Sequence, residues 1–350
     1  MHLSRRQFSV LMASLAAVSP SKLFAATGAE LTAQAAKPVD TSKFKKAGPY
    51  KIGVACGWLS ISWVVYAKQY ILWAADQHKA DVKSVVFTDA AFNPAKQISD
   101  IEDLMRQNVD AILYWAADDK ALEEVLDRAV KAGIVTVNAF GSFVDKPGTV
   151  SNAVVDQWTL AETAAKAFAK DLNGKGKIAA IMTVAGSASA SDQLDALKSV
   201  LAQNPGIELL NVSYADFNRA KAKQVAENLL QAYPDMNGVF CTSGNQALGV
   251  VEAIDEAGRL ADFTVGPADE LNGWAKWVVA NKKGGSVPYS PIVGKVAFDL
   301  AIKILKGEPV PRGELIPIEY YSPADEDKIV RNDLPDDSWP GPLPAEFLPK

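Results

Sequence analysis

The sequence predicts an α/β protein of two lobes, each a parallel sheet flanked by helices. The chain has 350 residues, which suggests two domains at about 150 residues each. Short apolar runs alternate with helical patterns of about ten residues or more, the succession that βαβ units and parallel sheets require. The succession also occurs twice. NPAK at 93–96 returns as NRAK at 218–221, 125 residues later, and DAIL at 110–113 returns as NGVF at 237–240, 127 residues later.

The first half of the chain reads as four strands separated by helices. Pro94 stands where a helix accepts proline, at its first turn, and Gly133 stands where a helix commonly ends. After Pro94, the apolar residues Ile98, Ile101 and Leu104 follow the spacing of one helix face. Strands are therefore expected at 51–56, 82–88, 110–115 and 134–138, and helices at 64–77, from 94 onward and at 121–132.

The second half repeats this plan. Apolar runs typical of buried strands again alternate with helical patterns, and Gly258 ends the last helix. Strands are expected at 177–183, 207–214, 237–242 and 263–266, and helices at 192–203, 220–233 and 247–257. Because parallel strands place their carboxyl ends at one edge of a sheet, the binding loops of each lobe should gather there.

Composition excludes several classes of function. The net charge is −5 and no basic stripe is present, which argues against nucleic-acid binding. No apolar run reaches 18 residues, so no transmembrane helix is expected. Two histidines, His2 and His78, offer no polyhistidine metal site, and no cofactor-binding glycine motif follows a strand. Cys56 and Cys241 each end a strand in opposite halves and are expected to be separate buried thiols.

The two ends of the chain have compositions of their own. SRRQF at 4–8, a short apolar run and small residues at 24–26 predict a twin-arginine-type signal peptide over 1–26, with an ordinary secretory signal as the alternative. The mature protein would then work in the periplasm. Residues 27–47 are expected to form a flexible lead-in. The tail at 334–350 is rich in proline and is expected to be extended.

Several stretches carry a resemblance to a known family. NPAKQISDIEDL at 93–104 runs into VDAIL at 109–113, and KAGIVTV follows at 131–137. In the second half, ADFNRAK at 215–221 and ENLLQAYPD at 227–235 continue the likeness, followed by GVF and ALG at 238–240 and 247–249. This order resembles the ribose-binding-protein family of periplasmic solute receptors, over roughly residues 50–320.

The resemblance implies a periplasmic-binding-protein fold, with two lobes, a hinge of three crossovers and a ligand in the cleft between the lobes. The crossovers would lie near 151–157, 285–291 and 317–322. Lobe 1 would then comprise residues 48–155 plus 291–317. Lobe 2 would comprise residues 156–290 plus 318–333.

Aromatic residues at strand ends are the first candidates for ligand contact. In the family, the loop after the first strand brings aromatic side chains onto the ligand, and Trp63 and Trp58 lie in that loop here. Phe217 matches the family's aromatic residue in Ala-Asp-Phe, and Trp115 ends the third strand. An indole or phenyl ring covers the apolar C–H face of a sugar or polyol and leaves its hydroxyls free.

The polar candidates depart from the ribose pattern. The family's Asp-Arg after the fourth strand is Asn138-Ala139, and its ligand-gripping Arg falls near Gln193. The family's Asn-Asp is Ser243-Gly244-Asn245, and its Phe-Asp-Gly segment is Pro267-Ala268-Asp269. Asp156 lies on the first crossover, where a purely structural role is equally open. Loss of the arginine removes strong charge-assisted hydrogen bonds, which favours a small neutral polyhydroxy ligand.

These expectations point to an exported, monomeric solute-binding protein that captures a neutral sugar or polyol and delivers it to an ABC permease in the membrane. No cofactor or metal is expected. One alternative is a receptor that reports to a membrane sensor kinase or chemoreceptor. Another is a twin-arginine-exported enzyme, although the chain lacks a nucleophile elbow and metal-ligand spacing.

Overall fold

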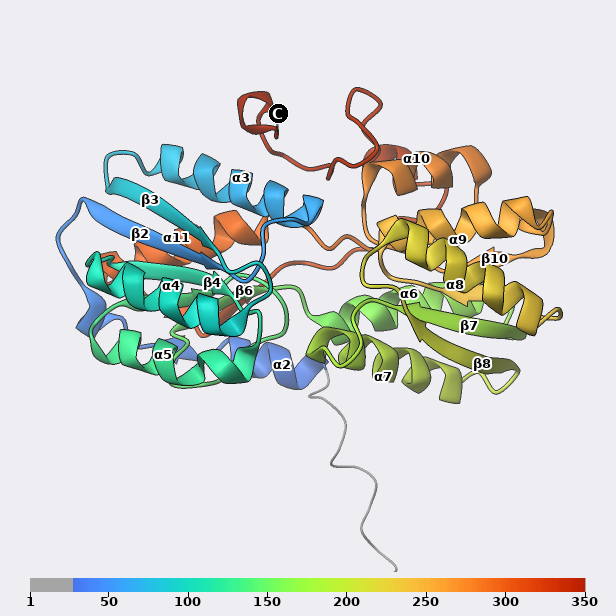
Figure 1. Cartoon of the computed structure of the whole chain (residues 1–350), viewed down its shortest axis with the longest axis horizontal. Coiled ribbons are helices and arrows are strands. Elements are labelled where there is room, and N and C mark those ends of the chain that lie inside the picture. Colours follow the sequence, from blue (N-terminus) through green and yellow to red (C-terminus); the bar gives the residue numbers. More distant parts are fainter. Residues whose placement is uncertain (1–27, 350) are drawn as a thin grey trace, which may run out of the picture.

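The computed structural model describes residues 28–349, which form two α/β lobes lying side by side (Figure 1). Each lobe is built on its own parallel sheet with helices on both faces. The fold class expected from the sequence is therefore confirmed. The expected signal peptide lies outside the described residues. Within residues 28–349, no helix is long and apolar enough to cross a membrane.

The first lobe contains a six-stranded sheet in the order β12-β6-β5-β4-β2-β3, with every neighbouring pair parallel. Its strands are β2 (Tyr50–Cys56), β3 (Val82–Asp89), β4 (Ala111–Trp115), β5 (Val135–Asn138), β6 (Ser151–Val154) and β12 (Gly313–Leu315). The helices of this lobe are α3 (Ser62–Gln77), α4 (Pro94–Arg106), α5 (Asp119–Lys131) and α11 (Val293–Lys306).

Both faces of this sheet are buried, because side chains alternate along each strand and both sets are apolar. Along β2, Ile52 and Val54 belong to the core beneath α3 and α11, whereas Ala55 belongs to the core beneath α4 and α5. The near-continuous apolar runs that predicted buried strands are the consequence of this double burial.

The second lobe contains a four-stranded parallel sheet in the order β10-β9-β7-β8. Its strands are β7 (Gly176–Met182), β8 (Ile207–Tyr214), β9 (Gly238–Phe240) and β10 (Thr264–Val265). Its helices are α6 (Gln157–Asp171), α7 (Ala188–Ala202), α8 (Arg219–Ala232), α9 (Gly244–Glu256) and α10 (Asn272–Asn281). Helix α6 packs on α7, and α8 packs on α9.

The chain passes between the lobes at three places in the hinge. It leaves the first sheet after β6 and enters α6, returns from the bridge residue Ser286 to α11, and passes again from β12 to Tyr321, which pairs with Ser286. The lobe boundaries expected from the sequence remain a proposal that these pairings support.

Several expected elements differ from the structure. Helix α7 begins at Ala188, four residues before the expected start, and helices α6, α10 and α11 were not predicted. The expected flexible lead-in instead contains α2 (Gly28–Ala35), the 3-10 helix η2 (Ser42–Phe44) and β1 (Pro38–Val39), which pairs with β11 (Val310–Pro311). Phe44 is buried in the first lobe, and this burial anchors the segment.

The remaining irregular segments hold three further 3-10 turns: η3 (Leu260–Asp262), η4 (Glu326–Lys328) and η5 (Ala345–Phe347). After η4, the proline-rich tail crosses from α10 to α3, and its end lies above α3 (Figure 1). Trp339 and Leu343 of this tail are buried. The tail is thus packed along the protein.

Candidate ligand-binding cleft

A cavity of about 620 Å³ lies between the lobes, where the carboxyl ends of both sheets meet. Its walls come from the loops that follow β2, β3, β4 and β5 in the first lobe and β7, β8, β9 and β10 in the second. This is the place where open parallel sheets bind ligands, because the loops there vary without disturbing the core.

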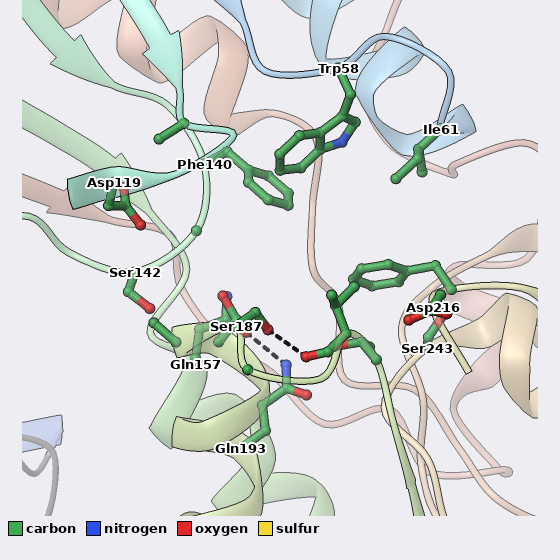
Figure 2. A pocket seen from close by; sticks show the side chains of 18 of the residues that line it. Trp58, Ile61, Asp119, Phe140, Ser142, Gln157, Ser187, Gln193, Asp216 and Ser243 are labelled. Carbon is green, nitrogen blue, oxygen red and sulfur yellow. Dashed lines mark hydrogen bonds between the residues drawn. The ribbon is translucent and has the colours of Figure 1, made fainter. Parts of the chain in front are cut away.

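The first-lobe wall is aromatic. Trp58, Phe92 and Phe140 line it, and Tyr289 joins them from the second crossover. The rings of Trp58 and Phe92 are stacked, with centroids 5.0 Å apart and planes 4° apart. Phe140 meets Trp58 edge-on at 5.5 Å, and both point into the cavity (Figure 2). Such a surface suits the C–H face of a sugar or polyol.

Phe92 and Phe217 occupy equivalent positions in the two lobes. Both have left-handed backbones, with φ of 64° and 56°. The following residue caps a helix in each case: Asn93 Oδ1 accepts from the Lys96 N–H at 3.1 Å, and Asn218 Oδ1 does the same for Lys221 at 2.9 Å. A left-handed bulky residue costs about 1 kcal/mol or more, so both loops are held against strain.

The second-lobe wall carries a buried hydrogen-bond network centred on Gln193. Its Nε2 donates to Gln157 Oε1 at 2.7 Å (Figure 2). Its Oε1 accepts from Thr242 Oγ1 at 2.7 Å. Ser243 precedes α9 but makes no capping hydrogen bond with its side chain, so its hydroxyl remains available to a ligand. This wall therefore offers neutral donors and acceptors.

Asp269 is the buried carboxyl of the cavity, with 6% of its surface exposed. One oxygen, Oδ1, accepts from the backbone N–H groups of Gly244 at 2.9 Å and Leu271 at 3.3 Å. Burial raises the pKa of Asp269 to about 7, and those two hydrogen bonds partly oppose the rise. The group can thus be protonated or ionised near neutral pH.

Two of the remaining charges of the cavity wall, Asp118 and Asp216, are engaged within the protein, and Asp119 and Lys120 also line it. Asp118 caps α5 by accepting from the Ala121 N–H at 2.9 Å, and Asp216 pairs with Lys221. Lys120 is the one cation among the described residues that line the cavity, and no arginine or histidine lines it there. One lysine among several carboxyls disfavours an anionic ligand.

The lobes touch directly beside the cavity. Ser142 Oγ, from the loop after β5, donates to Asp192 Oδ2 on α7 at 3.2 Å. Burial raises the pKa of Asp192, and the hydrogen bond from Ser142 opposes this. The contact joins elements of opposite lobes and would be lost if the lobes separated.

The family is settled by sequence comparison. The sequence profile described as "Periplasmic binding protein domain" matches residues 52–309. The ribose import binding protein RbsB of Bacillus subtilis is 30% identical over 288 residues, which are 82% of this chain and 90% of that protein. The chain belongs to the periplasmic binding protein family. The family consists of substrate-binding proteins of transporters, so the expectation of a binding protein that is not an enzyme is confirmed.

Solved structures agree with this membership. An ABC transporter solute-binding protein from Mycobacterium smegmatis with bound glycerol is 26% identical, with a TM-score of 0.72, and the match covers 82% of this chain and 98% of that one. Another, from Bacillus halodurans C-125 with bound myo-inositol, is 21% identical with a TM-score of 0.75, covering 81% and 98%. The second likeness concerns the fold alone.

The structure brings five of the nine predicted site residues to the cavity wall of this periplasmic binding protein. These are Trp58, Gln193, Phe217, Ser243 and Asp269. Their roles in binding stay predictions. Trp58 lies in the loop where the family resemblance implies aromatic contacts, and the other four were matched to positions of the family's pattern.

The four others lie outside the lining. Trp63 is buried on α3, where its Nε1 donates to the Tyr289 carbonyl and its ring packs on Phe140 at 4.8 Å. Trp115 is buried too, and its Nε1 donates to the Trp58 carbonyl at 2.9 Å. Both indoles thus support the aromatic wall from behind.

The two polar residues outside the lining hold backbone. Asn138 Nδ2 donates to the Ser142 carbonyl at 2.9 Å and to Asn152 Oδ1 at 3.1 Å, which fixes the loop after β5. Asp156 caps α6, with Oδ1 accepting from the Trp158 N–H at 3.0 Å. The structural reading of the first crossover is therefore the one that the geometry favours.

Sequence reasoning missed Phe92, Phe140, Tyr289 and Gln157. The repeat carried a signal for the first of these, because an offset of 125 residues from Phe217 leads to Phe92. No comparable signal marks Phe140 or Tyr289, since both lie in irregular loops whose path depends on packing across the hinge.

Neither a disulfide nor a cluster of metal-ligating side chains occurs among residues 28–349. Cys56 and Cys241 are both free and buried, as expected, and burial raises the pKa of each thiol. Among residues 28–349, no group of three or more metal-ligating side chains is close enough to hold an ion.

Proposed function

We propose that this periplasmic binding protein captures a small neutral sugar or polyol in the cleft and delivers it to an ABC permease. The observation that carries the ligand class is the pairing of an aromatic first-lobe wall with a neutral hydrogen-bonding network on the second lobe. The ring faces bury the C–H surface of the ligand, and the network satisfies its hydroxyls.

Capture would work by closure of the two lobes. A ligand that touches both walls binds best when the lobes are together, so it shifts the population toward the closed state. The direct contact between Ser142 and Asp192 belongs to that state. The closed form is then the one that a permease recognises.

Export, oligomeric state and partners belong to the same proposal. The twin-arginine-type pattern at 4–8 supports export to the periplasm, where the family works. We also propose that the protein acts as a monomer. The acidic net charge of −5 supports the absence of nucleic-acid binding.

The proposal is tested by a thermal-melt screen of refolded protein against pentoses, hexoses, glycerol, xylitol and myo-inositol. Unfolding and refolding removes solute that was carried through purification. A ligand at about 1,000 times its Kd adds roughly 4 kcal/mol to the free energy of unfolding, which raises Tm by several degrees. A single uncharged hit supports the proposal. No shift with any of these compounds contradicts it.

A further inference from the structure

The segment 331–348 begins on the second lobe and ends on the first, outside the three crossovers of the hinge (Figure 1). It lies beyond residues 52–309, the range that matches the family profile. The matches to the glycerol-bound and myo-inositol-bound structures cover 98% of each of those chains. They cover 82% and 81% of this chain, respectively. The segment therefore lies outside the range that the family profile describes.

The second-lobe end of the segment is fixed by Asn272, the fully buried first residue of α10. Its Nδ2 lies within hydrogen-bond distance of three carbonyl oxygens, those of Arg331 at 2.8 Å and of Leu334 and Pro335 at 3.0 Å. Its backbone N–H donates to the Ser338 carbonyl at 2.9 Å. One buried side chain thus holds a whole turn of the segment.

The first-lobe end is fixed on α3. Trp339 is 4% exposed, and its Nε1 donates to Ser62 Oγ at 3.3 Å. Gly341 lies so close to α3 that a Cβ atom there would come within 2.4 Å of the Tyr70 hydroxyl oxygen. Leu343 is buried a few residues later. Adjacent residues of the segment, Ser338 and Trp339, are therefore bonded to opposite lobes.

The sequence makes the segment stiff on both sides of this bonded pair. Proline stands at 335, before Ser338, and at 340, 342 and 344, after Trp339. Each proline fixes one backbone angle, so little chain entropy is lost when the segment is held in place. A short, stiff connection transmits a displacement that a flexible linker would absorb.

The anchor of Trp339 also leads to the cavity. Ser62 is followed by Trp63, whose ring stacks on Tyr289 with centroids 5.2 Å apart and packs on Phe140. Tyr289 and Phe140 line the cavity. Trp339 thus fixes the start of α3 behind the aromatic wall without touching the cavity itself.

We propose that residues 331–348 form a fourth link that limits separation of the lobes, and that Trp339 is a positioning residue for the aromatic wall. The link to ligand affinity rests on the proposed function of the cleft. The limit on separation does not, since it concerns the protein without ligand. Removal of the Trp339 anchor shifts the ligand-free population toward more open arrangements.

Distances between spin labels on the two lobes test this directly. Lys131 on α5 and Lys198 on α7 have exposed side chains, at 73% and 53%, and can be changed to Cys for labelling. The native thiols Cys56 and Cys241 are buried and stay unlabelled. Distance distributions are recorded for refolded protein without ligand.

The informative variants are Trp339→Ala and Gly341→Ala. The first removes the anchor, and the second drives a methyl group against Tyr70 and lifts the segment while keeping every side chain. Trp339→Phe keeps most of the packing and serves as the rescue variant. Trp277→Ala is the matched control, because Trp277 stacks on Trp274 within α10 of the second lobe.

Both informative variants should give longer and broader distances than the wild type, whereas W339F and W277A should not. Binding of whichever solute among ribose, xylitol and myo-inositol raises Tm should weaken about threefold or more in W339A, because fewer molecules are competent to close. If W339A does not melt cooperatively, G341A decides. Unchanged distances in the folded variants overturn the proposal, and distance changes without any solute binding contradict only the proposed function.

Discussion

The two walls of the cleft come from equivalent loops of a repeated design, yet they carry different chemistry. The first-lobe wall is a packed set of rings, Trp58, Phe92 and Phe140. The second-lobe wall is a hydrogen-bond network around Gln193, with the buried carboxyl of Asp269. The repeated scaffold fixes where side chains stand, and the loops decide whether a wall recognises the C–H face or the hydroxyls of a ligand.

The largest expected effect is a dependence of stability on pH. It arises on the second-lobe wall, because that wall holds the buried carboxyl of Asp269. Burial raises the pKa of Asp269 from 3.8 to about 7, so the folded state binds this proton more tightly than the unfolded chain. The stabilisation is full below pH about 4 and is lost as pH rises through about 7, amounting to roughly 4 kcal/mol at most.

Asp269→Asn should reduce the change in the free energy of unfolding between pH 4 and pH 8. Urea unfolding at a series of pH values in this range measures the change. Some of the change should remain, because burial also raises the pKa of Glu270 to about 8 and of Glu326 to about 7. An identical change in the wild type and the variant would show that Asp269 does not titrate in this range.

The next effect removes the centre of the aromatic wall. Trp58→Ala should weaken sugar or polyol binding by about 2 kcal/mol, close to 30-fold, as expected for a central aromatic contact. The loop should keep its path, because Trp115 donates to the backbone carbonyl of Trp58 and not to its side chain. Calorimetric titration beside Trp277→Ala measures the loss, and equal affinity in both variants would contradict the stacking role.

On the opposite wall, Gln193→Ala should weaken binding by about tenfold, or roughly 1.4 kcal/mol. The change leaves Gln157 and Thr242 without the partner that orients them toward the cavity. Gln203→Ala is the control for the loss of a side-chain amide, because Gln203 is exposed and directly follows α7, the helix that carries Gln193. Affinity within twofold of wild type in Q193A would contradict the network's role.

The smallest effect compares the equivalent residues Phe92 and Phe217. Replacement of either by Ala should lower affinity by about 1 kcal/mol. Replacement by Gly should give the same affinity but a fold more stable than the Ala variant by about 0.5–1 kcal/mol, since glycine accepts a left-handed backbone freely. Urea unfolding of the four variants measures this, and a Gly variant less stable than its Ala counterpart would contradict the strain.

Ser243 and Asp269 were predictable because the family resemblance implies ligand contacts in loops after strands, and the end of a strand can be read from an apolar run. Ser243 and Asp269 follow such runs and lie in the cavity wall. Trp63 shows the limit of this approach. It is the second residue of α3, and the direction of its side chain is set by packing on Tyr289, which is distant in sequence.

The same limit explains the other departures. Asp156 is a helix cap, a role that the residue type alone does not distinguish from ligand contact. Phe140 and Tyr289 become neighbours only when the second crossover folds against the loop after β5, with centroids 5.7 Å apart. The prolines of the tail predicted an extended segment. Its attachment to α3 was not predictable, because it depends on the hydrogen bond between Trp339 and Ser62, which are distant in sequence.

A crystal structure of the protein with the solute that raises Tm tests the central claim most directly. The account predicts one molecule between the lobes, with its C–H face against Trp58 and Phe140 and its hydroxyls within hydrogen-bond distance of Gln193, Ser243 or Asp269. A solute bound elsewhere, or one whose hydroxyls are held by the first lobe while its apolar face meets the second, would contradict the division of labour between the two walls.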